Sequence, residues 1–253
     1  MKIKKNRRKV PVLRDSEIDA YAEELLKKYE PQILSEPQAL NIEDFAEFHM
    51  GFNIHYTHLS HNGFIWGKMV FQDSLILNYD PATGRAGEEP VEANTIVIDN
   101  RLIDKEHAFR STVAHETAHG IFHPEYYFHN YNPRQVLFSF VDDEEYHSSI
   151  CSTFCRDKNI KADVNTHRKF ETDIEWIEHQ AKYFSAAILM PKTAVYMLLD
   201  DHKTQNPWDD NAFVKIISEI FNVSVASAKI RIKTLHTAYL TYLTEKQSIN
   251  LFS

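Results

Sequence analysis

The feature that most constrains this chain is the stretch VAHETAHGIFH at residues 113–123. On a helix, two residues four positions apart project from the same face, one turn apart. His115 and His119 can therefore direct two imidazoles at one metal ion, and Glu116 lies about 100° around the helix, beside them. The flanking residues are small or apolar, namely Val113, Ala114, Ala118, Gly120, Ile121 and Phe122. We therefore expect a buried helix, in which two histidines beside a carboxylate are costly unless they bind something.

The H-E-x-x-H pattern is typical of zinc metalloproteases. Neutral imidazole is a suitable ligand for zinc, and a carboxylate at position 116 can accept the proton of the attacking water. The alternative is an exposed helix face with two histidines and an ordinary acidic neighbour, which the apolar flanks do not favour. His123 lies a further turn along the axis, too far to share a metal held between the first two histidines. We expect one zinc ion on His115 and His119, Glu116 as the general base, and a structural role for His123.

A catalytic zinc site needs a third protein ligand, and the best source is DIEWIEHQAKYFSAAILMP at residues 173–191. This stretch resembles the E-x-x-A-N-x-F-A-A-x-L-L-M-P segment that follows H-E-x-x-H in the ImmA/IrrE metallopeptidases. The strand-like TIVIDN before the first helix and FNVSVASAKIRIKTL at 221–235 resemble further parts of that family, in the same order. The resemblance implies a zincin-like fold, with Glu178 as the third zinc ligand.

Other interpretations of this second helix stay open. Glu178 and Lys182 are spaced as an ordinary helix ion pair, and Glu175 lies within one turn of Glu178. Lys182 also departs from the family pattern, which has Asn or Asp there, where an acceptor can orient a zinc-bound histidine. A lysine ammonium offers no acceptor, so another group must orient the histidine or the site is weaker. Gln180 replaces a frequent Glu, a change that we expect to be harmless.

The remaining pattern predicts an α+β fold, with helices segregated from a small, mostly antiparallel sheet of three or four strands. Strands are expected at residues 52–60, 63–71, 73–80 and 93–100. Helices are expected at residues 17–29, 41–50, 105–122, 173–190 and 211–241, with Asp15 and Ser16 as candidate caps of the first. Residues 125–170 are expected to be irregular.

Charge and residue composition divide the chain into three expected segments. Residues 1–14 carry seven Lys or Arg and no acid, which predicts a flexible, solvated basic arm. Residues 15–200 would form the metallopeptidase domain, and residues 201–253 a helical, helix-turn-helix-like segment. Lys229, Arg231 and Lys233 alternate instead of lining one face, and the chain has a net charge of −8. Direct nucleic-acid binding is therefore not expected, and the C-terminal segment is interpreted as a packing and partner-docking element.

The sequence also bears on compartment. It contains no apolar run of the roughly 18 to 20 residues that cross a bilayer, and no apolar stretch follows its basic N-terminus. Its two cysteines, Cys151 and Cys155, do not suggest a disulfide framework. We therefore expect a cytoplasmic protein without a membrane partner. On a helix, His147 and the two cysteines would form a stripe and a second metal site, but buried free thiols are favoured.

The predicted function is zinc-dependent hydrolysis of a peptide bond. Tyr126, Tyr127 and His129 are candidates for the group that stabilises the oxyanion, and the strand at 93–100 for aligning an extended substrate by strand addition. The family resemblance implies that the substrate is a helix-turn-helix transcriptional repressor. The alternative is a metal-binding interaction module that inactivates a regulator without cleavage. Glu116 argues against this alternative, because a closed structural zinc site does not use a base.

Overall fold

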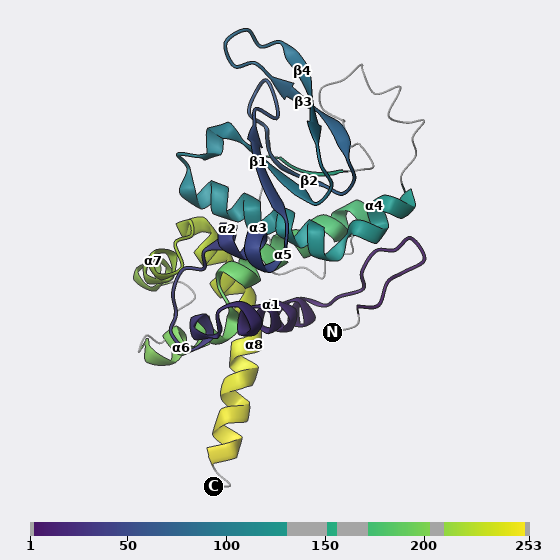
Figure 1. Ribbon diagram of the computed structural model, residues 1–253. Helices are drawn as coiled ribbons and strands as arrows, with labels where there is room; N and C mark the ends of the chain where they lie inside the picture. Colours follow the sequence, from purple (N-terminus) through teal and green to yellow (C-terminus); the bar gives the residue numbers. More distant parts are fainter. Residues whose placement is uncertain (1–2, 131–150, 156–171, 203–209, 251–253) are drawn as a thin grey trace.

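A computed structural model of the protein describes residues 3–130, 151–155, 172–202 and 210–250 (Figure 1). The strands are β1 (Asn53–Thr57), β2 (Ile65–Val70), β3 (Ser74–Tyr79), β4 (Ala86–Val91), β5 (Thr95–Asp99) and β6 (Cys151–Cys155). The α-helices are α1 (Asp15–Tyr29), α2 (Ile42–Asp44), α3 (Glu106–Phe122), α4 (Pro124–Asn130), α5 (Asp173–Leu189), α6 (Lys192–Asp201), α7 (Asn211–Ile220) and α8 (Val225–Asn250). A π-helical turn, Phe45–His49, extends α2. The strands lie on one side of α3, and α1, α6 and α8 lie on the other, which confirms the α+β class.

Four strands form a mixed sheet in the order β1-β5-β2-β6, and β3 and β4 form a separate antiparallel hairpin. β1 and β5 are parallel, whereas β2 is antiparallel to both of its neighbours. The sheet is thus less purely antiparallel than expected, because β5 pairs in parallel with β1. Neither β4 nor β6 was expected. The β4 sequence AGEEPV has poor strand propensity, and β6 lies in the stretch expected to be irregular.

The two faces of the sheet have different covers. Met69, Ile96 and Ile98 join the main core with the apolar residues of α3. Val70 and Val97 point the other way and pack with Ile76 and Val91 of the β3–β4 hairpin. β5 is therefore buried on both faces, which explains its continuous apolar sequence.

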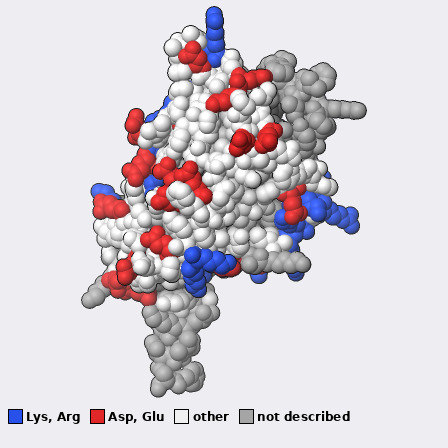
Figure 2. Space-filling view, viewed as in Figure 1, with Lys and Arg blue, Asp and Glu red and all other residues white. Residues whose placement is uncertain are grey.

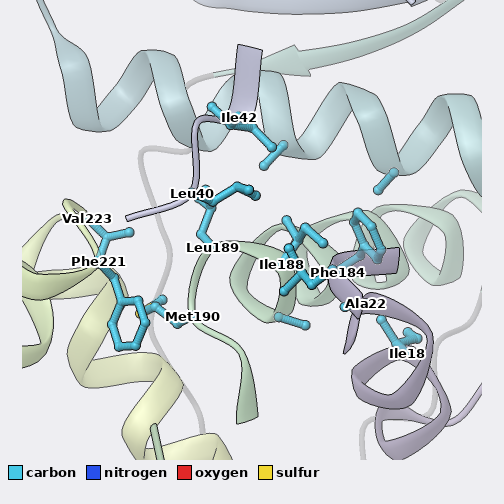
Figure 3. Close-up of a cluster of buried hydrophobic side chains, with 14 of the residues drawn as sticks. Ile18, Ala22, Leu40, Ile42, Phe184, Ile188, Leu189, Met190, Phe221 and Val223 are labelled. Carbon is cyan, nitrogen blue, oxygen red and sulfur yellow. The ribbon is translucent and has the colours of Figure 1, made fainter. Parts of the chain in front are cut away.

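The helical core lies beyond α3. Helix α5 packs between α3 and α1. Figure 3 shows Ile18 and Ala22 of α1 near Phe184 and Ile188 of α5, with Phe221 and Val223 from the α7–α8 junction at the other end of the cluster. This packing holds α3 and α5 side by side.

Several helix boundaries differ from expectation for a local reason. Pro124 and Pro191 were expected to end helices, and they also begin or precede the next ones, α4 and α6, since proline is tolerated in a first helical turn. The predicted helix at 211–241 is two helices, because Asn222 takes a left-handed φ of 50° between them. Helix α1 begins at Asp15 with Arg14 as its cap, and Glu17 accepts from the Arg14 backbone N–H.

The N-terminal segment is not the flexible arm that its charge suggested. Lys5 and Pro11 form a β-bridge, and Val10 and Leu13 are buried. Three cations are paired with acids of the body, in the contacts Lys5–Glu125, Lys9–Glu125 and Arg8–Asp173. Figure 2 shows a group of blue side chains at the side of the molecule where this segment lies, with separate acidic patches scattered over the remaining visible surface. Residues 3–14 therefore form a small docked hairpin.

Helix α8 packs on α5 and α6 before it projects from the body (Figure 1). Arg231 is 1% exposed and donates to the Met190 carbonyl at 3.1 Å. One of the three charges that a DNA-reading interpretation would need is thus inside the protein. Within the described residues, no helix is long and apolar enough to cross a bilayer.

Candidate metal centre

Two helices bring three metal-ligating side chains together. His115 and His119 lie one turn apart on α3, and Glu178 faces them from α5. The Nε2 atoms of the two histidines are 3.0 Å apart. The Glu178 carboxylate oxygens lie 3.4 Å from His115 Nε2 and 3.3 Å from His119 Nε2. Residues that are 59 to 63 positions apart in the chain thus converge because α3 packs along α5.

The donor set fits a zinc ion. Two ligand atoms bound to one tetrahedral zinc at about 2.0–2.1 Å lie about 3.3–3.4 Å from each other. The three separations, 3.0, 3.3 and 3.4 Å, are close to that value. Both imidazoles are buried, whereas the Glu178 side chain is 26% exposed, so the group is reached from the Glu178 side. A His/His/Glu set is also the donor chemistry of catalytic zinc sites.

Glu116 is fully buried between α3 and the sheet. Its neighbour on β2 is Gly67, where an added Cβ would lie 3.1 Å from the Glu116 Cγ and 2.5 Å from Thr112 Cγ2. Glycine at this position therefore permits β2 to lie directly against the face of α3 that carries Glu116. Sequence reasoning missed Gly67, because its neighbours on α3 are more than 40 positions away.

Glu178, not Glu175, faces the histidines. Burial raises the pKa of the Glu178 carboxyl, but the adjacent imidazoles of His115 and His119 outweigh burial and hold this pKa well below its usual range. Glu175 instead accepts from the Thr172 backbone N–H at 3.1 Å and forms the capping box of α5. The alternative assignment of Glu175 as ligand is therefore not supported by its position.

Behind His119 runs a buried line of polar contacts. His119 Nδ1 lies 3.0 Å from His123 Nδ1, and His123 Nε2 lies 3.0 Å from Gln180 Oε1. Gln180 Nε2 donates to the Pro11 carbonyl at 2.8 Å. Burial, followed by the neighbouring His119, holds the pKa of His123 well below its usual range. His123 is thus outside the donor cluster, as expected, whereas Gln180 has specific contacts that the sequence did not reveal.

Lys182 is exposed, so its position does not indicate a role in orienting a histidine ligand. Of the three residues proposed to stabilise an oxyanion, Tyr127 has a ring contact with His119, with 6.3 Å between the ring centroids. It is largely buried and stacks on Phe71. His129 is exposed, and Tyr126 is partly buried against the main core.

Two further expectations need correction. β5, the strand expected to align a substrate, is paired on both sides by β1 and β2, so it has no edge for strand addition. Cys151 and Cys155 lie in strand β6 and not on a helix, so the helical stripe that would have formed a second metal site is absent. His147 lies outside the described residues.

No protein-family model and no curated protein matches this chain. The likeness to the ImmA/IrrE metallopeptidases therefore rests on the motifs quoted above, and the candidate site rests on its own geometry.

Proposed function

We propose that this protein is a zinc-dependent endopeptidase of the ImmA/IrrE type with a zincin-like fold. The observation that carries the proposal is the convergence of His115, His119 and Glu178 within 4.8 Å of one another, on two packed helices. The residue after the first histidine is a buried carboxylate, Glu116. This combination matches a hydrolytic zinc site better than a structural one, which would have four protein ligands and no adjacent base.

Each residue has a distinct role in the proposal. The two histidines and Glu178 hold one zinc ion per chain. A bound zinc ion supplies Lewis acidity, which makes water nucleophilic near neutral pH and polarises a peptide carbonyl. Glu116 accepts the proton of the attacking water and delivers it to the leaving amine. Tyr127 is the candidate for stabilising the oxyanion, because it lies beside His119.

The substrate that we propose is a folded helix-turn-helix repressor in the cytoplasm. Its support is the motif resemblance to ImmA/IrrE proteins, whose members act on such regulators. The C-terminal helices α7 and α8 are proposed to dock this partner, since Arg231 is buried and unsuited to contact DNA. The boundaries proposed for these segments, at residues 15 and 201, stay predictions.

The experiment measures bound zinc per chain in the wild type and in Glu116→Gln, with cleavage of a candidate repressor assayed in parallel. Removal of the base should leave the three ligands in place, so we expect one zinc in both proteins and cleavage only in the wild type. A matched control is Glu125→Gln, since Glu125 is an exposed acid at the start of α4 that pairs with Lys5 and Lys9. This control should keep both zinc and cleavage.

Other outcomes contradict the proposal in different ways. Equal repressor inactivation by wild type and Glu116→Gln, with zinc in both, would establish the alternative function, in which binding without hydrolysis inactivates the regulator. Absence of zinc from the wild type would exclude the metal centre itself.

A further inference from the structure

The buried contacts behind His119 have a defined direction. The Pro11 carbonyl oxygen can only accept a hydrogen bond. The Gln180 amide nitrogen, which lies 2.8 Å from it, must therefore face Pro11, and the amide oxygen faces His123. Because an amide oxygen also only accepts, Nε2 of His123 must carry the proton in this contact.

The direction continues to the metal ligand. With its proton on Nε2, a neutral His123 presents a lone pair on Nδ1. That lone pair accepts from Nδ1 of His119, 3.0 Å away. His119 then carries its own proton on Nδ1, and its Nε2, the atom that lies 3.3 Å from Glu178, has a lone pair for a metal. One assignment of donors and acceptors thus satisfies all four groups, which are the Pro11 carbonyl, Gln180, His123 and His119.

We propose that His123 and Gln180 are positioning residues, which set the tautomer and ring orientation of His119 for metal binding. We call the series of hydrogen bonds from the Pro11 carbonyl through Gln180 and His123 to His119 the relay, and the Pro11 carbonyl is its fixed end. The inference rests on the proposed metal centre and adds the group that orients one of its ligands. Outer groups of this kind typically contribute on the order of 10–100-fold to metal affinity.

The relay answers the question raised by Lys182. That position is exposed, so the orienting acceptor comes from elsewhere, and His123 and Gln180 are both 0% exposed. The relay also ties the N-terminal hairpin to the metal centre. Trp176 of α5 donates from Nε1 to the same Pro11 carbonyl at 3.1 Å, which holds that oxygen in place.

The first test locates the proton on His123 without reference to activity. Ring ¹⁵N chemical shifts of histidine distinguish the two neutral tautomers. We expect His123 to carry its proton on Nε2, both in metal-free and in zinc-loaded wild type, and to lose this preference in Gln180→Leu. A His123 proton on Nδ1 in the wild type would overturn the relay.

The second test measures zinc affinity by competition with a chromophoric chelator. We expect His123→Leu to weaken zinc binding on the order of 10–100-fold, and His123→Gln, which restores an acceptor oxygen, to regain part of the loss. The matched control is His202→Leu, because His202 is a partly buried histidine that is bonded to Asp210 at 2.9 Å and lies outside the donor group. Its zinc affinity should equal that of the wild type.

The two proposals fail in separable ways. Wild-type zinc affinity in both His123→Leu and Gln180→Leu would overturn the relay and leave the peptidase proposal intact. A confirmed His123 tautomer with zinc bound but no peptide cleavage would support the relay and remove the peptidase. Thermal unfolding of each variant identifies any loss of zinc affinity that comes from misfolding. If His123→Leu is misfolded, the zinc affinity of His123→Gln decides whether the relay exists.

Discussion

Nη2 of Arg231 lies 2.6 Å from Oδ1 of Asp19, and both side chains are almost completely buried. This ion pair joins α8 to α1 across 212 positions of the chain. The other carboxylate oxygen accepts from the Tyr183 hydroxyl of α5 at 2.8 Å. The helix that carries Glu178 is thus tied to the first and the last helix at one carboxylate.

Breaking this ion pair should destabilise the protein strongly. Asp19→Leu leaves the Arg231 guanidinium buried without its counter-charge, and we expect a loss of about 3–5 kcal/mol in the free energy of unfolding. The double variant Asp19→Leu/Arg231→Met should recover much of that loss, because an apolar pair of similar volume removes the uncompensated charge. Urea unfolding of the three proteins provides the comparison. Equal stabilities of the single and double variants would contradict the expected recovery.

Gly67 should be intolerant of a methyl group. In Gly67→Ala the new Cβ would lie 2.5 Å from Thr112 Cγ2, so we expect β2 to move from α3, with a loss of about 1–3 kcal/mol in the free energy of unfolding. Thr112→Ser removes that methyl and retains the hydroxyl that donates to Ala108. The double variant Gly67→Ala/Thr112→Ser should therefore be more stable than Gly67→Ala alone in thermal unfolding. A double variant that is less stable would show that another contact is responsible.

Glu178 and Glu175 offer a matched pair on one helix. Glu178→Gln removes a carboxylate that lies against both histidines, so its zinc affinity should fall by more than the roughly 100-fold at the upper end of outer-group effects. Glu175→Gln changes the capping box and leaves the donor group intact, so it should keep zinc and lose about 0.5–2 kcal/mol of stability at most. Chelator competition and urea unfolding measure the two effects. A larger loss of zinc in Glu175→Gln would reverse the assignment.

The buried His123 should make the metal-free protein less stable in mild acid. Because burial holds its pKa well below the usual range, the folded protein leaves His123 neutral where the unfolded chain, below about pH 6.5, binds a proton. The stability that the neutral His123 contributes is therefore present above about pH 6.5 and is lost as the pH falls below it.

Replacement of that histidine should flatten the pH dependence. In the presence of a chelator, His123→Gln should lose up to about 1.4 kcal/mol less per pH unit than the wild type between about pH 6 and pH 5. Unfolding by urea at several pH values measures both slopes. Parallel slopes would mean that His123 is protonated in the folded protein.

Local patterns explain why parts of the fold were predictable. His115, Glu116 and His119 share one side of α3 because of their helical spacing, and α3 and α5 follow the residue ranges expected for them. β4 was missed because its Gly, Pro and Glu residues disfavour a strand, and it is a strand because β3 pairs with it along six positions. The docked N-terminal hairpin was missed because charge alone predicts solvation, whereas Val10 and Leu13 anchor it.

The sequence by itself determined the helix that carries the candidate metal ligands His115 and His119, since two imidazoles at a spacing of four share a face on any helix. It also determined the class of the fold, because apolar periodicity is a property of neighbouring residues. Only the tertiary structure decided which carboxylate completes the donor group, that Gly67 lies against Glu116, and that Gln180 connects His123 to Pro11. The physical reason is distance along the chain: these contacts join residues whose spacing carries no local signal, and only the packing of α3, α5 and the N-terminal hairpin brings them together.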